Sequence, residues 1–501
     1  MAILSKAWNN FKTQPDVWFF YGFLLTLALS VRNVLFFYPI NGNFNEYTGI
    51  YLYLSDILLI LTILVWIVTI LRNKKLNLSS CITFFSRQEI FVLPLVLLVW
   101  SFLSISWSGN TNLALFRSLK LAEFYLLFLY LAYNVSRLPR EYEMFHVEHF
   151  VFLRGGTFIR SVFRIFIALG FIQAIIGITQ AILQHSVGLF WLKESLISLN
   201  IDGVANVMLF GHKFIRAYGL FPHPNILGGF LLVSIIFTYF YSKLFHPSRN
   251  VPPQQECSIW NILRGKHGTF LNIALIIQIL ALLLTFSKSA ILGLFIVICY
   301  GGYKMFRARP VICHSGFYGV EHFYRYLITI VIILALFITI LGFNINSLLF
   351  KSLNERLLYL NVSRETIVNN PIVGIGMGQF VENMQKYSSV FLANWQYQPV
   401  HNVFLLIWSE LGIIGLVLFI LFLWKVFHAC PVGQNCSTWN NSVPTGVEQV
   451  GLLRGGTVFK GILLGFIIIM LFDHYLWDIQ QGQIMLWLVL GLVVGVKNIE
   501  K

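Results

Sequence analysis

Residues 403–424 read VFLLIWSELGIIGLVLFILFLW, an apolar run with a single charge at Glu410. As a helix, a run of this length crosses about 30 Å of hydrocarbon. The whole chain has this character, since 57% of its 501 residues are hydrophobic and only 11% are charged. A soluble domain cannot bury so large a share of apolar surface. We therefore predict a membrane protein with helical spans, because lipid leaves the edges of open strands unsatisfied.

The apolar runs predict an all-α fold, a polytopic bundle of about twelve helices that forms a single membrane domain over residues 1–501. The expected spans are 17–38, 50–71, 90–106, 113–133, 165–184, 224–242, 270–287, 289–303, 327–344, 403–424, 461–477 and 483–496. Two segments between spans are long enough to hold chemistry, 185–223 and 345–402. We expect both to be extracytoplasmic, and the second to be a large helical loop between spans nine and ten.

The distribution of basic residues predicts the orientation. With the N-terminus in the cytoplasm, roughly two thirds of the 35 Lys and Arg residues fall in cytoplasmic loops or tails. We therefore expect a multi-pass protein of the inner (plasma) membrane, with both termini cytoplasmic. The net charge of +15 then reflects topology and contact with anionic membrane lipid, so it does not indicate a nucleic-acid partner.

Short segments recur in the expected cytoplasmic loops. LRGGT occurs at residues 153–157 and again at 453–457, and CSIWN at 257–261 returns as CSTWN at 436–440. The loops that carry such insert-like repeats are 134–164, 243–269, 304–326 and 425–460. Two interpretations remain open: a docking tag for a cytoplasmic partner, or a mobile element inserted where the chain tolerates additions.

Seven charged residues lie inside the expected spans, all in the outer half or at its edge: Arg32, Asp56, Arg117, Lys120, Glu123, Glu410 and Asp473. A charge in the membrane is costly and usually faces a partner or a polar cavity. Arg117, Lys120 and Glu123 are spaced by three residues and share one stripe of a helix. One interpretation is a set of internal ion pairs, such as Asp56 with Lys120. The other is a water-accessible cavity that opens to the exterior.

More cations lie in the loops near that expected cavity. Arg216 precedes the 224–242 span, Lys288 occupies a tight turn, and Arg356 and Arg364 lie on a helix that Asn370-Pro371 should end. Arg forks fit phosphate oxygens, so such a group could hold the diphosphate of a lipid-linked donor without a metal. The chain has no Asp-x-Asp pair, and we expect no metal and no cofactor. The stretch 374–378, GIGMG, follows Asn-Pro rather than a strand, so we interpret it as a turn and not a phosphate loop.

Three stretches resemble the O-antigen ligase family, bacterial membrane glycosyltransferases that include polymerases and protein O-glycosylation enzymes. They are RAYGLFPHPNILG at 216–228, NERL at 354–357 with NPIVGIGMGQF at 370–380, and HNVFL at 401–405 with ELGIIG at 410–415. The resemblance implies a glycan donor on undecaprenyl diphosphate, an inverting transfer on the outer face, and no metal. The family usually has Arg in a Ser-Arg turn and another Arg early in the large loop. Arg356 matches the second, whereas Ser287-Lys288 departs from the first and loses the bidentate fork.

The resemblance leads to a hypothesis about the site. His401 is the expected base that takes the proton of the acceptor hydroxyl, while Arg356 and Lys288 neutralise the leaving diphosphate. The expected substrate-binding residues are Arg216, Arg364, His223, Asn225, Asn402, Glu410, Arg117 and Lys120. The acceptor is a lipid, a glycan or a protein. A polymerase of the same superfamily and a transporter or flippase of the lipid-linked glycan are the alternatives.

Overall fold

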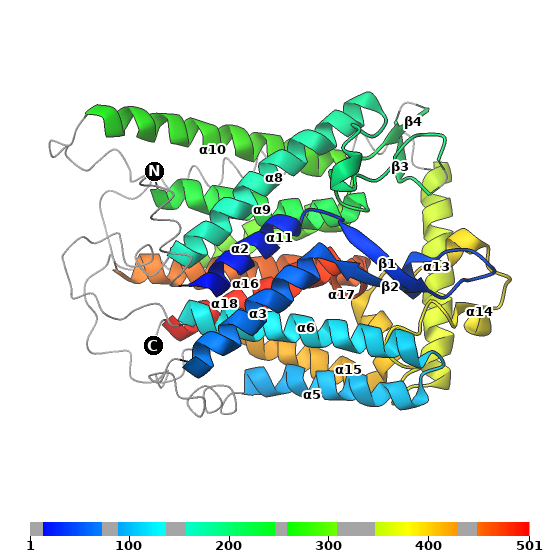
Figure 1. Ribbon diagram of the computed structural model, residues 1–501. Coiled ribbons are helices and arrows are strands. Elements are labelled where there is room, and N and C mark those ends of the chain that lie inside the picture. The colour runs from blue at the N-terminus through cyan, green and yellow to red at the C-terminus, as the bar shows by residue number, and fades with distance from the viewer. Residues whose placement is uncertain are drawn as a thin grey trace.

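The computed structural model describes residues 14–72, 89–136, 157–201, 203–209, 211–245, 258–307, 346–428 and 448–499. These residues form a bundle of helices with two small antiparallel hairpins (Figure 1). The longer helices are α2 (Pro15–Thr26), α3 (Leu54–Arg72), α5 (Glu89–Leu103), α6 (Thr111–Ser136), α8 (Thr157–Leu183), α9 (Pro224–Phe245), α10 (Ser258–Leu284), α11 (Lys288–Arg307), α13 (Asn346–Asn369), α15 (Val403–His428), α16 (Glu448–Phe472) and α18 (Gln480–Ile499). The short elements are β1 (Arg32–Phe37), η1 (Glu46–Thr48), β2 (Gly49–Tyr53), η2 (Ser104–Trp107), η3 (Phe190–Leu192), β3 (Asn206–Leu209), β4 (His212–Ile215), α14 (Met384–Tyr387), η4 (Asn394–Gln396) and α17 (Tyr475–Asp478).

Several of these helices have the length and composition of membrane spans. Five described helices are long and apolar enough to cross a bilayer: α3, α5 with η2, α8, α9 and α15. Shorter apolar helices lie within α10, α11, α16 and α18. The predicted helical, membrane-type character is thus confirmed. The count of twelve spans stays a prediction, and the expected span 327–344 and most of the repeated loop segments lie outside the described residues.

The first two expected spans are wrong in part. α2 ends at Thr26, and residues 32–37, expected as helix, form β1, which pairs with β2 at the start of the second expected span. The Arg32 guanidinium explains this, since it donates hydrogen bonds to Glu46 at 2.5 Å and to the Tyr53 hydroxyl at 3.1 Å. It also lies over the Tyr51 ring, 4.5 Å from the ring centre. A hairpin brings these partners together, whereas one straight helix would separate them.

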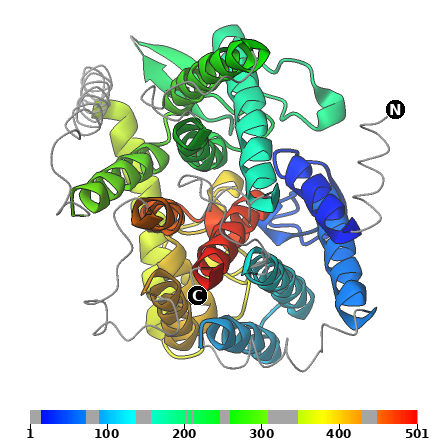
Figure 2. The same cartoon turned by 90° about the vertical axis from the view of Figure 1, so that its left-hand side faces the viewer.

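Helix α18 forms the centre of the bundle. Viewed from one end, it lies among the other helices (Figure 2) and packs mainly against α6. Glycines allow this close approach, because a Cβ at Gly491 would lie 2.7 Å from the Leu131 Cβ and one at Gly495 would lie 2.5 Å from the Val135 Cβ. Small residues at such crossings let two membrane helices pack with their backbones close together.

One end of the bundle collects the non-membrane elements. Both hairpins, α14 and α17 lie there, and α13 runs across the direction of the bundle helices (Figure 1). The predicted helix around Arg356 and Arg364 ends at Asn369, immediately before Asn370-Pro371, as its sequence indicates. The expected span 461–477 is shorter than predicted, because α16 ends at Phe472 and the next residues turn into α17. That turn carries Asp473 and His474 into the same end of the molecule.

Candidate active site

His401 lies at this end, two residues before α15. Its ring stacks on the Tyr359 ring from α13, with centroids 5.6 Å apart and planes 9° apart. The His474 ring stands nearly perpendicular to it, with centroids 5.2 Å apart. The buried Nδ1 of His401 has no hydrogen-bond partner among the described residues. Burial, and then the positive charges of His474 and Arg356, lower the pKa of His401 to about 4, so the ring is neutral at pH 7 and can accept a proton.

Two carboxylates hold His474. Its Nδ1 lies 2.9 Å from both carboxylate oxygens of Asp478, and its backbone N–H donates to Asp473 Oδ1 at 2.9 Å. His474 is only 6% exposed and Asp473 only 4%. Burial alone would lower the pKa of His474, but the Asp478 and Asp473 carboxylates outweigh it and raise that pKa. In turn, burial would raise the pKa of Asp473, and the neighbouring histidines lower it instead.

A hydrogen-bonded chain joins Arg216 to Asp473. Arg216 donates from Nε to the Thr285 carbonyl at 2.6 Å and from Nη2 to Asn225 Oδ1 at 2.5 Å. The Asn225 amide then donates to Asp473 Oδ2 at 2.6 Å. Asn225 also donates its backbone N–H to His223 Nδ1 at 3.2 Å. Burial, with the Arg216 charge, lowers the pKa of His223 to about 3, so this ring is neutral as well.

Lys288 and Arg356 complete a group of three cations. Lys288 begins α11, and the charges of Arg356 and Arg216 both act on its ammonium. Arg356 acts on His401 and His474 too, so it links Lys288 electrostatically to the two histidines. Arg364 lies two turns further along α13 and is exposed to solvent. Within the described ranges, no group of three or more His, Cys, Asp or Glu side chains could hold a metal ion.

Residues 273–420 match the Wzy_C family model, described as O-antigen ligase. This stretch is therefore similar to O-antigen ligases. The match confirms the predicted resemblance, and it contains Lys288, Arg356 and His401, while Arg216 precedes it and His474 follows it. No curated protein matches the chain. The match and the apolar helices together support a membrane protein similar to enzymes of the O-antigen ligase or polymerase type.

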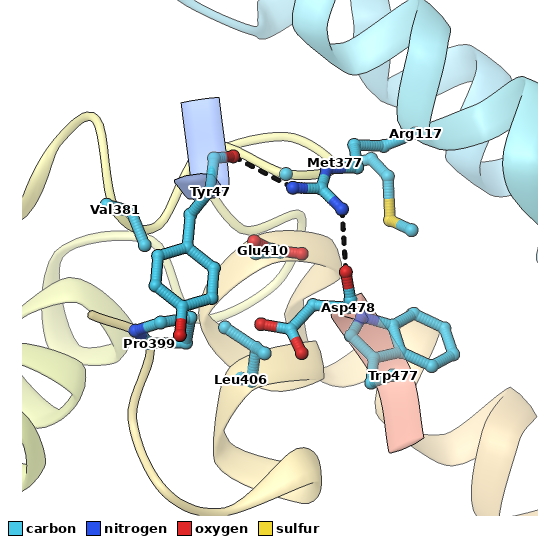
Figure 3. Close-up of a pocket in the computed structure, with 10 residues that line it drawn as sticks. Tyr47, Arg117, Met377, Val381, Pro399, Leu406, Glu410, Trp477 and Asp478 are labelled. Carbon is cyan, nitrogen blue, oxygen red and sulfur yellow. Dashed lines mark hydrogen bonds between the residues drawn. The ribbon is translucent and has the colours of Figure 1, made fainter. Parts of the chain in front are cut away.

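A small recess lies between α6, α17 and the segment from Met377 to Glu410. Arg117 spans it, donating to the Tyr47 carbonyl and to the Asp478 carbonyl at 2.8 Å each (Figure 3). The Glu410 and Asp478 side chains line the same space. Two buried donors of this lining, Arg117 Nε and Trp477 Nε1, have no partner among the described residues. These two N–H groups are therefore available as hydrogen-bond donors to a polar group in the recess.

Lys120 is engaged in an ion pair. Its ammonium contacts Asp56 and lies 3.1 Å from Glu123, and all three side chains are largely buried. Asp56 also accepts from the Tyr53 backbone N–H at 2.9 Å and from the Gln480 amide at 2.5 Å. Of the two interpretations that the sequence left open, the internal ion pair describes Lys120, whereas Arg117 on the same stripe lines the recess.

Asn402 caps a helix. Its side-chain oxygen accepts the Leu405 backbone N–H at 3.0 Å, and its amide donates to the Leu471 carbonyl at 3.1 Å. Such an N-cap typically contributes about 1 kcal/mol. In this position Asn402 fixes the start of α15, and with it the placement of His401.

The glycine-rich stretch 374–378 packs against α15. The Gly376 N–H donates to the Glu410 carbonyl at 2.8 Å, and the Phe380 N–H lies 3.4 Å from Glu410 Oε1. α15 departs from helical geometry at Gly412, whose φ of 68° favours glycine. The amides of this turn therefore serve the protein's own Glu410, as expected for a structural turn and not for a phosphate loop.

Sequence reasoning missed four residues of this region: Tyr47, Tyr359, His474 and Asp478. Tyr47 packs its ring against His474 with centroids 5.6 Å apart. The one available signal was the spacing of His474 and Asp478, which puts an acid and an imidazole on neighbouring positions of a helical turn. Tyr47 and Tyr359 lie far in sequence from the histidines that they contact, His474 and His401. A pattern along the chain does not reveal such contacts.

Proposed function

We propose that the chain is a metal-independent membrane glycosyltransferase, which moves a glycan from an undecaprenyl-diphosphate-linked donor to an acceptor hydroxyl on the outer face of the inner membrane. One observation carries the proposal. The charge of Arg356 acts both on Lys288 and on His401, Arg216 acts on Lys288 as well, and His401 is neutral with a buried Nδ1 that has no partner among the described residues. Cations suit a diphosphate, and a neutral imidazole suits a hydroxyl proton. These are the two functions that displacement of a diphosphate by an alcohol requires.

In the proposed step, the acceptor oxygen attacks the anomeric carbon as the bond from that carbon to the diphosphate oxygen breaks. His401 takes the hydroxyl proton at Nδ1 as the new glycosidic bond forms. The configuration inverts because attack and departure occur on opposite faces. Lys288 and Arg356 stabilise the negative charge that develops on the diphosphate, which leaves on its lipid carrier. Arg216, fixed by Thr285 and Asn225, adds a third positive charge.

The location of the site supports a lipid-linked donor. The candidate residues lie where α9, α11 and α15 begin, so a headgroup at the membrane surface would meet them while its hydrocarbon tail stays in lipid. Both segments expected outside the membrane, 185–223 and 345–402, contribute: Arg216 comes from the first, and Arg356 and His401 from the second. Arg117 and Glu410 in the adjoining recess are the proposed contacts for the acceptor.

Paired substitutions test the assignment of the two principal groups. We expect H401A to lower the transfer rate about 10²–10⁴-fold and R356A about 10²–10³-fold in proteoliposomes with a polyprenyl-diphosphate-linked glycan. His428 at the other end of α15 and Arg364 on the same helix as Arg356 provide matched controls, and H428A and R364A should transfer at wild-type rates. If H401A and R356A both kept full activity, the proposal would be wrong.

A deletion strain separates the alternatives. If the protein is a ligase, the acceptor loses even single-unit glycans. Loss of long chains alone would identify a polymerase of the same superfamily. Donor stranded on the inner leaflet would instead identify a transporter or flippase, and would contradict the transferase proposal.

A further inference from the structure

His474 lies directly beside the proposed base, outside the O-antigen ligase domain match, and the reaction described above gives it no role. Its ring meets His401 edge to face at 5.2 Å, while Tyr47 packs on it from another side at 5.6 Å. Its Nδ1 is taken by the two Asp478 oxygens at 2.9 Å. An ionised carboxylate at hydrogen-bonding distance from a buried imidazole favours the charged form of the ring.

We propose that His474, held by Asp478 and set edge to face against His401, is a positioning residue that keeps the His401 ring ready to accept a proton. This inference rests on the proposed function, in which His401 is the base. The class of group involved is a carboxylate–imidazolium pair that acts on a second imidazole through space. His474 itself does not touch the reacting atoms in this scheme.

The surroundings of His401 show why a charged neighbour matters. From α13, Arg356 and the stacked Tyr359 ring face it, and from the segment before α9 the neutral His223 acts on it. From the turn after α16 come His474 and the Asp473 carboxylate. Asp473 and a hydrogen bond with the Pro399 backbone favour protonation of His401, whereas His474 and Arg356 oppose it. A neutral residue in place of His474 would leave the buried Asp473 carboxylate, and Asp478 without its histidine partner, near a base that must stay unprotonated.

The direction in which each substitution changes the pKa of His401 follows from these charges. Burial and the His474 charge both lower the pKa of His401, so His401 is protonated only in acid. H474Q removes the positive charge and leaves Asp478 negative, which raises the pKa of His401 by roughly 1–2 units. D478N releases His474 to its neutral form and removes both charges, so it should raise that pKa by less. H474K keeps a positive charge opposite Asp478 and should leave the pKa low.

The test measures His401 itself. The full-length protein is labelled with ¹³C-histidine in nanodiscs, its His401 resonance is assigned with H401Q, and the resonance is titrated by NMR in wild type, H474Q, D478N and H474K. We expect the midpoint to rise in the order H474K, D478N, H474Q, while the exposed controls H428Q and E365Q leave it unchanged. Equal midpoints in H474Q and wild type would overturn the inference, as would H474K behaving like H474Q. Folding is monitored by the thermal midpoint of each variant, and D478N provides the test if H474Q does not fold.

Activity provides an independent readout. The acidic limb of the pH–rate profile for glycan transfer should move to higher pH in H474Q, and H474K should restore it. A purely structural role would lower the rate at every pH and leave the limb in place, which contradicts the inference. If the NMR midpoint shifts as expected but H401A retains full transfer activity, the His474 inference stands and the assignment of His401 as the base fails.

Discussion

The buried ion pair of α6 offers the sharpest test of how charges are used in this protein. Lys120 is 7% exposed and Asp56 only 2%, and the Lys120 ammonium contacts both Asp56 and Glu123. K120M removes the cation and leaves two largely buried carboxylates without it. Removal of one partner from a buried ion pair costs about 3–5 kcal/mol, because the remaining charge is left uncompensated. We expect K120M to lower the free energy of unfolding by that amount.

The triple variant D56N/K120M/E123Q provides the control. It removes all three charges, and the single Oδ1 of Asn at position 56 can still accept one of the two hydrogen bonds that Asp56 accepts from the Tyr53 N–H and the Gln480 amide. Fully neutral replacement of a buried ion pair is often tolerated, so we expect the triple variant to lie within about 2 kcal/mol of wild type. The variant with three substitutions should therefore be more stable than the variant with one.

The assay is unfolding of the purified protein in mixed micelles, followed by tryptophan fluorescence, with transfer activity normalised to folded protein. Retained activity in the triple variant would show that Lys120 is structural. If the triple variant were less stable than K120M, the explanation that K120M is destabilised by uncompensated carboxylates at Asp56 and Glu123 would be refuted. If K120M were as stable as wild type but inactive, Lys120 would belong to the substrate site.

Two further predictions concern packing and pH. G495V places a side chain 2.5 Å from the Val135 Cβ and should cost about 1–3 kcal/mol in the same unfolding assay, while G301A, with nothing within 4 Å, should be close to neutral. The Glu194 carboxylate accepts hydrogen bonds from the Gln180 amide and from three backbone N–H groups, which outweigh burial and lower its pKa. Its stabilisation is thus complete above the ordinary value of 4.5 and lost as the pH falls through the lower folded pKa. E194Q should cost about 1–3 kcal/mol at pH 7 and flatten this acid dependence, measured by the thermal midpoint across the acid range.

The membrane class and most helix positions could be predicted from sequence because hydropathy is a local property of the chain. The same property misled at residues 32–37, where an apolar run is a strand. Composition over six residues does not distinguish a strand from a helix. Whether residues 32–37 form a strand or a helix depends on the hydrogen bonds of Arg32 with Glu46 and Tyr53. These contacts form only when the chain turns back on itself.

The candidate site divides in a similar way. Arg356 and His401 could be selected because each lies in a stretch that resembles the O-antigen ligase family, and Lys288 because it occupies the position of that family's Ser-Arg turn with Lys in place of Arg. The partners that determine how His401 behaves come from elsewhere: Tyr359 from the middle of α13 and His474 from the turn after α16. The stripe of Arg117 and Lys120 also looked uniform in sequence. Their environments differ because Asp56 of α3 reaches only Lys120.

The cations of this protein fall into two groups according to their partners, and this difference bears on which of them bind the donor. Lys120 and Arg32 are each matched by carboxylates within the fold, so an incoming anion would gain little from them. The Lys288 ammonium instead experiences the like charges of Arg356 and Arg216. Such repulsion is unfavourable in the empty site and is relieved when an anion of matching charge binds between them. A diphosphate would therefore gain more at this group than at either ion pair, and this difference supports the assignment of the donor headgroup to Lys288 and Arg356.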